Sequence, residues 1–141
     1  MLNIGFDVSQ TGSTKAGCGY FAHALATVLS HSGKQNYCFL ASFGDFYFDP
    51  SMPLGNPYPG PTSSYGARHL TRESARHYWN GKDLAAAVAG FDILHSNNFW
   101  CPAHPIVPRL VYTLYDLGFL IDPRWTTEAN RLGCFEGVFR A

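Results

Sequence analysis

The most constraining feature of this chain is the order of three segments near its N-terminus. Leu2–Val8 is a short apolar run, which is typical of a strand. Gly17–Ser32 places apolar side chains at helical spacing, and Gly33 then suits the C-terminus of a helix. Asn36–Phe43 is aromatic and apolar, which predicts a buried strand. A strand, a helix and a second strand in this order predict a right-handed crossover between parallel strands.

The rest of the chain continues this alternation. It predicts an irregular Pro-rich insertion at about residues 44–70, a helical region over Thr71–Gly90 broken near Gly81, strands at Asp92–His95 and Arg109–Leu114, and a last helix starting at Asp122-Pro123. Leu132, Phe135 and Phe139 give that helix an apolar stripe. Alternating strands and helices predict an α/β fold with a mostly parallel sheet flanked by helices. The length, 141 residues, is about that of one domain.

Composition narrows the functional class. Hydrophobic residues make up 46% of the chain, and ten basic residues balance ten acidic ones. A neutral chain has no electrostatic footprint for nucleic acid, so we expect no nucleic-acid partner. No apolar run approaches the roughly 20 residues needed to span a bilayer, and the N-terminus lacks the pattern of a signal peptide. These features predict a cytoplasmic protein.

The cysteines do not indicate a metal site. Cys18, Cys38, Cys101 and Cys134 are scattered without a CxxC pair, so we expect reduced thiols that are mostly buried. His95, Cys101 and His104 are close in sequence, but a zinc site would need a second close-spaced pair. We therefore expect no metal.

Polar residues follow the predicted strands at the points where each strand ends. They are Asp7-Val8-Ser9, Phe43-Gly44-Asp45, the run His95–Asn98, and Tyr115-Asp116. Parallel α/β sheets bind ligands beyond the carboxyl ends of their strands. The sequence therefore predicts a binding site at this edge of the sheet.

The segment from Gly17 to Ala22 matches G-x-G-x-x-A, a dinucleotide-binding pattern. Its distance from the first strand disfavours that interpretation, because about eight residues separate Val8 from Gly17. A P-loop is excluded, since Cys18-Gly19 replaces the Lys-Ser/Thr that binds phosphate and magnesium. Two interpretations remain open: the backbone N–H groups hold an anion, or the glycines only turn the chain.

The other polar residues also leave alternatives open. His95 is either a structural group or part of a site, and Asn97 and Asn98 offer donors and acceptors to a polyhydroxy ligand. Tyr115 and Asp116 could orient a substrate hydroxyl, with Asp116 as the base, or Asp116 could cap the following turn.

Four segments together carry a resemblance to a known family. They are Ile4-Gly5-Phe6-Asp7, the stretch Ala16–Phe21, Asp92-Ile93-Leu94-His95, and Val111–Leu117 (VYTLYDL) followed by Asp122-Pro123. Their order and spacing resemble the N-terminal half of the family 4 glycosyltransferases. These are retaining, nucleotide-sugar-dependent enzymes with two Rossmann-like domains. The Pro-rich insertion has no counterpart in this resemblance.

The resemblance implies a set of roles. On the matched motifs, it places the donor diphosphate at Gly17, Cys18 and Gly19, the acceptor at His95, Asn97 and Asn98, and the catalytic positions at Tyr115 and Asp116. The family carries His where this chain has Tyr115. A phenol donates a hydrogen bond but, with a pKa near 10, is a poor proton acceptor. The implied substrates are a nucleotide-sugar and a sugar or lipid-linked acceptor, with no cofactor.

The resemblance also implies a second domain that binds most of the donor. We expect residues 1–141 to be the acceptor-side domain of a hexosyltransferase, a fragment with little activity alone. A lipid-linked acceptor would place it at a membrane surface, although no strongly basic amphipathic helix supports this. Two alternatives stay open: a stand-alone nucleotide- or sugar-binding module, and a dinucleotide-dependent oxidoreductase.

Overall fold

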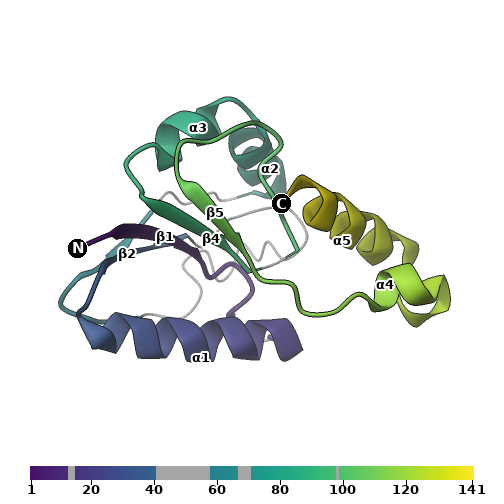
Figure 1. The fold of residues 1–141 in the computed structure, drawn as a ribbon, viewed down its shortest axis with the longest axis horizontal. Helices are drawn as coiled ribbons and strands as arrows, with labels where there is room; N and C mark the ends of the chain where they lie inside the picture. Colours follow the sequence, from purple (N-terminus) through teal and green to yellow (C-terminus); the bar gives the residue numbers. More distant parts are fainter. Residues whose placement is uncertain (13–14, 41–57, 67–70, 98) are drawn as a thin grey trace.

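The computed structural model describes residues 1–12, 15–40, 58–66, 71–97 and 99–141 (Figure 1). Within these residues, one parallel sheet has five strands in the order β3-β2-β1-β4-β5. The strands are β1 Asn3–Asp7, β2 Asn36–Leu40, β3 Ser63–Tyr65, β4 Ile93–Ser96 and β5 Arg109–Tyr112. The fold is therefore α/β with an all-parallel, Rossmann-like sheet, as predicted.

The strand order creates a switch point beside the central strand β1. From β1 the chain adds β2 and then β3 on one side, and it later adds β4 and β5 on the other. Gly5 of β1 is in register with Cys38 of β2 and Leu94 of β4. In sheets of this kind the crevice at the carboxyl ends of the two strands where the order reverses is the usual ligand position. Here that crevice lies after Asp7 and Ser96.

Helices cover both faces of the sheet. Helix α1 (Gly17–Ser32) lies on one face, and helices α2 (Arg72–Asn80) and α3 (Asp83–Val88) lie on the other (Figure 1). Helix α1 ends at Gly33, whose φ of 62° lies in the left-handed region where glycine is favoured. The predicted helix over residues 17–32 and the predicted break near Gly81 are both confirmed.

Each face of the sheet has its own core. On the α1 side, buried side chains of the sheet and helix pack together: Phe6, Val8, Ala26, Tyr37, Phe39 and Tyr58. On the other side the core joins β2 and β4 to α2 and α3, through Leu40, Ala75, Trp79, Leu84, Val88 and Leu94. Alternate strand residues serve opposite faces, which is why the strands read as nearly continuous apolar runs in the sequence.

The prediction that residues 44–70 form only an irregular insertion is wrong in one part. Ser63–Tyr65 forms β3 and pairs with β2 in the register Cys38 with Ser64. A three-residue polar strand has no apolar periodicity to reveal it, and it is specified instead by pairing with the open edge of β2. Residues 41–57 and 67–70 lie outside the described residues, as does the predicted continuation of β2 to Phe43.

The predicted helix start at Asp122-Pro123 is confirmed, but it begins a short 3-10 helix and not the last α-helix. Asp122 caps a short 3-10 helix, η1 (Pro123–Trp125), by accepting a hydrogen bond from Arg124 N at 3.0 Å. Helix α5 (Glu128–Arg140) begins after a second cap, Thr127, whose hydroxyl accepts from Asn130 N. A short helix, α4 (Gly118–Ile121), precedes both and was not predicted. Asp122 and Thr127 each cap a separate helix within six residues, so the sequence around Asp122-Pro123 did not show which cap begins the last helix.

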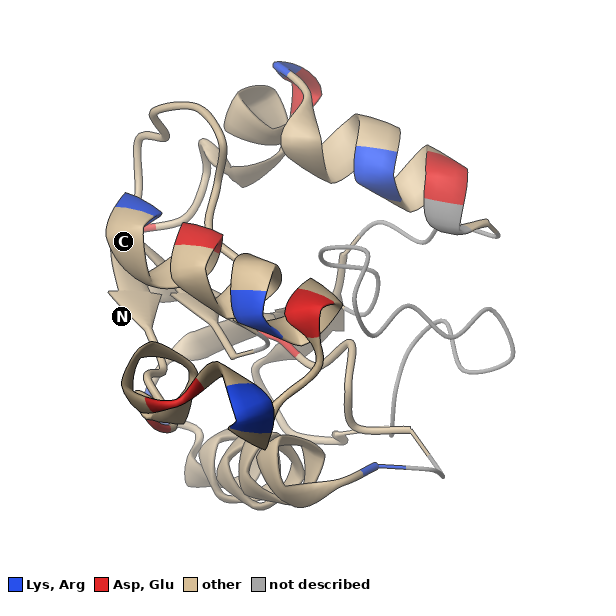
Figure 2. Cartoon of the chain, turned by 90° about the vertical axis from the view of Figure 1, so that its right-hand side faces the viewer, with Lys and Arg blue, Asp and Glu red and all other residues tan. Residues whose placement is uncertain are grey.

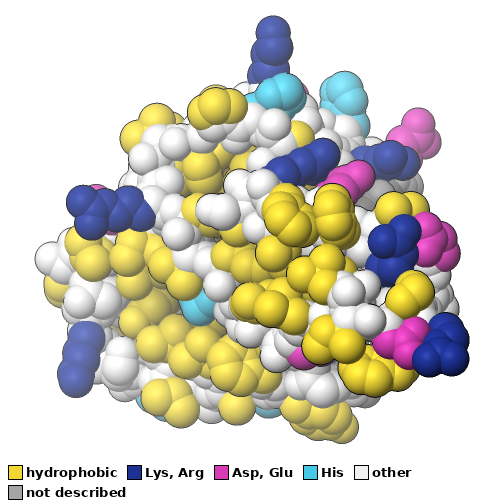
Figure 3. Space-filling view, turned by 45° about the vertical axis from the view of Figure 1, so that its right-hand side comes forward, with side chains coloured by type: hydrophobic (Ala, Val, Ile, Leu, Met, Phe, Trp, Pro, Cys, Tyr) yellow, Lys and Arg dark blue, Asp and Glu magenta, His cyan; other side chains and the backbone are white. Residues whose placement is uncertain are grey.

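The surface of α5 is mixed in charge and partly apolar. Figure 2 shows acidic and basic residues alternating along this helix, and the pairs Arg131–Glu128 and Arg140–Glu136 lie 2.7 and 3.4 Å apart. Its apolar stripe exists but stays exposed, at 49% for Leu132 and 66% for Phe139. Figure 3 shows hydrophobic side chains gathered over the face that carries α4 and α5. Among the described helices, none has the length and apolar character to cross a bilayer.

Candidate functional site

The carboxylate of Asp7 lies at the switch point, at the end of β1. It is fully buried, and one oxygen accepts hydrogen bonds from the N–H and hydroxyl of Ser9 at 2.9 and 2.6 Å. Its other oxygen accepts from the main-chain N–H of Asn97 at 3.3 Å. Burial raises the pKa of the Asp7 carboxyl to about 7, although these hydrogen bonds favour the charged form. Asp7 therefore ties the end of β1 to the loop after β4 and titrates near neutral pH.

Asn97 is the centre of this network, and its side chain is fully buried. Its Nδ2 donates to the carbonyl of Asp7 at 3.1 Å, and its Oδ1 accepts from the hydroxyl of Thr113 at 2.7 Å. Its own carbonyl accepts from Gln10 Nε2 and, at 2.8 Å, from the hydroxyl of Tyr115. Both ends of the Asn97 amide are thus committed inside the protein. Asn97 would therefore affect ligand binding indirectly, by fixing the position of the loop that contains it.

The same network sets the tautomer of His95. Because the Asp7 carbonyl can only accept, Asn97 must direct its Nδ2 there and its Oδ1 to Thr113, which therefore donates. His95 Nε2, 2.8 Å from the same hydroxyl, must then be the donor to Thr113. Burial lowers the pKa of His95, so the ring is neutral at pH 7 with Nδ1 as an acceptor.

Tyr115 connects this network to the glycine-rich segment. Its hydroxyl lies 2.8 Å from the Asn97 carbonyl and 3.3 Å from the carbonyl of Cys18. Its ring is held between Phe21 of α1 and Phe99, with centroids 5.6 and 5.2 Å away. The residues predicted as the diphosphate loop, the acceptor loop and the catalytic position therefore meet at one hydroxyl group.

Among the described residues, the N-terminus of α1 has no capping side chain. Ala16 offers no side-chain cap, and the first turn contains no acidic residue. A side chain at Gly17 would meet nothing within 4 Å, whereas one at Gly19 would lie 2.3 Å from the Gln10 carbonyl. Gly19 is thus required for packing, while Gly17 leaves the helix end accessible. Lys15 adds a positive charge beside it, with its Nζ 5.1 Å from the Tyr20 ring centroid.

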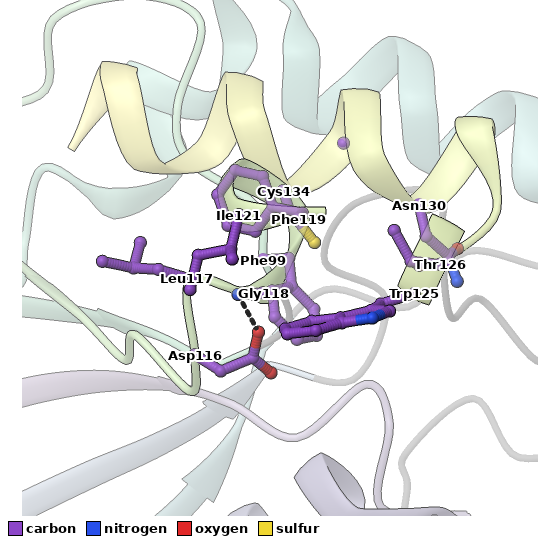
Figure 4. A pocket seen from close by; sticks show the side chains of 11 residues that line it. Phe99, Asp116, Leu117, Gly118, Phe119, Ile121, Trp125, Thr126, Asn130 and Cys134 are labelled. Carbon is purple, nitrogen blue, oxygen red and sulfur yellow. Dashed lines mark hydrogen bonds between the residues drawn. The ribbon is translucent and has the colours of Figure 1, made fainter. Parts of the chain in front are cut away.

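Asp116 points to a different cavity. Its Oδ1 accepts a hydrogen bond from Gly118 N at 2.8 Å, which confirms that Asp116 caps the turn into α4. It also lines a cavity of about 550 Å³ between α4, η1 and α5 (Figure 4). This cavity is lined by Phe99, Asp116, Leu117, Gly118, Phe119, Ile121, Trp125, Thr126, Asn130, Gly133 and Cys134. Among the predicted site residues that the structure describes, only Asp116 lines it, and Phe99 lies between it and Tyr115.

Most of the predicted site residues lie together at the switch point. Gly17, Cys18, Gly19, His95, Asn97 and Tyr115 lie around the switch point, and Asn98 is outside the described residues. Sequence reasoning missed Gln10, Lys15, Thr113 and Trp125 as site residues. Thr113 lies inside the VYTLYDL segment and Trp125 follows Asp122-Pro123. Their positions in these motifs were the sequence features that could have identified both residues.

Comparison with known proteins adds no relative to this description. No protein-family model, curated protein or solved structure matches the chain significantly. Across the described residues, no group of three or more His, Cys, Asp or Glu side chains is arranged to hold a metal ion.

Proposed function

We propose that this chain is the acceptor-side, Rossmann-like domain of a glycosyltransferase that moves a sugar from a nucleotide-sugar to an acceptor hydroxyl. The observation that supports this most is the position of the Tyr115 hydroxyl, which contacts the carbonyls of both Cys18 and Asn97. Three segments that carry the family resemblance thereby converge at the switch point of the sheet, where α/β proteins bind ligands.

In this proposal each group has a chemical task. The N–H groups from Gly17 to Gly19, with Lys15, stabilise the negative charge of the donor diphosphate. At the switch point, neutral His95 offers its Nδ1 as a hydrogen-bond acceptor to a sugar hydroxyl, and Asn97 holds the loop beside it. The acceptor oxygen bonds to the anomeric carbon, the nucleoside diphosphate leaves, and the hydroxyl proton passes to a base, for which Asp116 is our candidate.

The proposal includes a second domain that binds most of the nucleotide-sugar, no cofactor, and a cytoplasmic location. A lipid-linked acceptor would add a membrane surface. The test is release of nucleoside diphosphate by the full-length gene product from UDP- and GDP-sugars in the presence of glycoside acceptors. We expect turnover with at least one donor, a large loss in Lys15→Ala, and no change in Val107→Ala, an exposed site on another loop. No turnover with any donor contradicts the proposal.

The open end of α1 also favours a second candidate, a nucleotide-binding module without transferase activity. Calorimetry distinguishes the two, because UDP or GDP would then bind, and Lys15→Ala would weaken binding, while no sugar is ever transferred. A fluorescence titration with NADH tests the dinucleotide-dependent oxidoreductase alternative. That alternative requires the NADH fluorescence to change on binding, and an unchanged signal would exclude it.

A further inference from the structure

The cavity between α4 and α5 has the lining of a binding site for a particular class of small molecule. Most of its side chains are apolar, from Phe99 at the back to Leu117, Phe119, Ile121 and Trp125. Two of them are strongly exposed although large and apolar: Ile121 at 72% and Trp125 at 67%. Concave apolar surfaces with a few polar groups are typical of small-molecule sites.

The residues in the wall of the cavity are closely packed and restricted in conformation. A Cβ on Gly118 would lie 3.1 Å from Asp116 Oδ1 and 3.4 Å from the Trp125 ring, so glycine lets these two side chains approach. Phe99 has a φ of 60°, a conformation that costs an aromatic residue free energy and that is found most often at functional positions. Its main-chain carbonyl lies so close to Gly137 of α5 that a Cβ there would be only 2.1 Å away. Phe99 is therefore clamped in place between α5 and Tyr115.

The charge of the cavity restricts the ligand. Among the described residues that line it, Asp116 is the only one with a charged side chain. The cations of the neighbouring η1 and α5 are already paired: Arg124 lies 2.6 Å from Asp122, and Arg131 lies 2.7 Å from Glu128. A negatively charged ligand would meet a carboxylate and no partner cation, so the cavity disfavours phosphates and nucleotides.

The polar groups stand at the two ends of one aromatic surface. In Figure 4 the carboxylate of Asp116 lies beside one end of the Trp125 indole, and Thr126 and Asn130 lie beside the other. One Asp116 oxygen holds Gly118 N, and within the described residues the other has no hydrogen-bond partner in the protein. A carboxylate oxygen in this position accepts a hydrogen bond from a ligand hydroxyl.

We propose that this cavity binds a neutral, hydroxylated small molecule with a hydrophobic body. The body packs on Trp125, Phe119 and Ile121, and one hydroxyl donates to Asp116. This deepens the proposed function, on which its biological meaning rests: the ligand would be the sugar acceptor, with its hydrophobic body in this cavity and its hydroxyl on Asp116, the candidate base. Acceptors with a charged group would be rejected.

The test is direct binding to the full chain by calorimetry, without any nucleotide-sugar. Hexyl β-glucoside supplies the body and the hydroxyls, methyl β-glucoside lacks the body, and hexyl sulfate has the body with a negative head. We expect hexyl β-glucoside to bind at least about tenfold more tightly than methyl β-glucoside, since burial of two methylene groups already gives about that factor. Hexyl sulfate should be weaker than hexyl β-glucoside by a similar factor. Equal binding of hexyl sulfate and hexyl β-glucoside overturns the proposal.

Variants locate the site. Trp125→Ala and Ile121→Ser change exposed side chains, so both should fold, and each should weaken hexyl β-glucoside binding about tenfold. Phe139→Ala removes an equally exposed aromatic of α5 outside the cavity lining and should leave binding unchanged. Asp116→Asn keeps an oxygen for Gly118 N but removes the charge, and it should bring hexyl sulfate closer to hexyl β-glucoside in affinity. Equal losses in Trp125→Ala and Phe139→Ala overturn the proposal. Because no donor is present, these results are independent of sugar transfer.

Discussion

The hydroxyl of Tyr115 lies 2.8 Å from the main-chain carbonyl of Asn97 and donates a hydrogen bond to it. That carbonyl also accepts from Gln10, so the loop after β4 is fixed both to the loop after β1 and to the segment after β5. The strand ends on the two sides of the switch point are thus joined through one residue.

The first prediction concerns the Tyr115 hydroxyl. Tyr115→Phe keeps the ring contacts with Phe21 and Phe99 and removes only the hydrogen bonds to the loop carbonyls. We expect the free energy of unfolding in urea to fall by about 1 kcal/mol. Tyr20→Phe is the matched control, because Tyr20 is 61% exposed and its change should have no measurable effect. Equal stabilities for the two variants would contradict the role of the hydroxyl.

The second prediction concerns the tautomer of His95. Nitrogen NMR of the wild type should show a neutral ring protonated on Nε2, because that atom donates to Thr113. Thr113→Val removes the hydroxyl and should change the tautomer balance and lower the free energy of unfolding by about 1–3 kcal/mol, since Asn97 Oδ1 loses its donor. Thr113→Ser retains the hydroxyl and should restore the wild-type spectrum. A ring protonated on Nδ1 in the wild type would show the assigned donor order to be wrong.

The third prediction is a pH dependence that originates at Asp7. Its pKa is about 7 in the folded protein and 3.8 ordinarily, so the folded state binds more protons between these values. The free energy of unfolding should therefore fall as the pH rises from about 4 to 7, by up to about 4 kcal/mol from this group, and level off above pH 7. Stability is highest where Asp7 is protonated in both states.

Urea unfolding at several pH values measures this effect. Asp7→Asn cannot ionise, so the difference in stability between wild type and variant should shift steadily in favour of the variant from pH 4 to 7. Asp83→Asn, at an exposed position in the first turn of α3, should retain the wild-type profile. Parallel profiles for wild type and Asp7→Asn would exclude Asp7 as the source.

The fourth prediction separates the two glycines of the same motif. Gly19→Ala places a methyl group 2.3 Å from the Gln10 carbonyl, and a main-chain atom cannot easily move away. We expect it to lower the free energy of unfolding by at least about 2 kcal/mol. Gly17→Ala meets nothing within 4 Å and should be neutral or stabilising by up to about 1 kcal/mol, because alanine favours the helix. If the protein binds a diphosphate here, Gly17→Ala should weaken that binding without loss of stability.

The local residue pattern was sufficient to predict the helices and strands that bury their own apolar side chains. The bounds of α1 agree with the prediction because the helical spacing of its apolar residues and the terminating Gly33 both lie within one segment. The strands β1 and β4 were also predicted from their apolar runs, although each observed strand is shifted or shortened by one residue at its ends. By contrast, β3 is polar and short, and it is a strand only because β2 offers an unpaired edge.

The sequence by itself determined the fold class and the edge of the sheet where polar residues collect, since periodicity and the ends of apolar runs are local properties. Only the tertiary structure decided what those residues do. Asp7 and Asn97 are 90 positions apart, and Tyr115 and Cys18 are 97 apart, so no local pattern could show that they share hydrogen bonds. Separation along the sequence is also the reason why the cavity could not be predicted, since residues from Phe99 to Cys134 on separate elements line it. Burial then sets the chemistry, because the pKa of the Asp7 carboxyl is raised only where folding removes it from water.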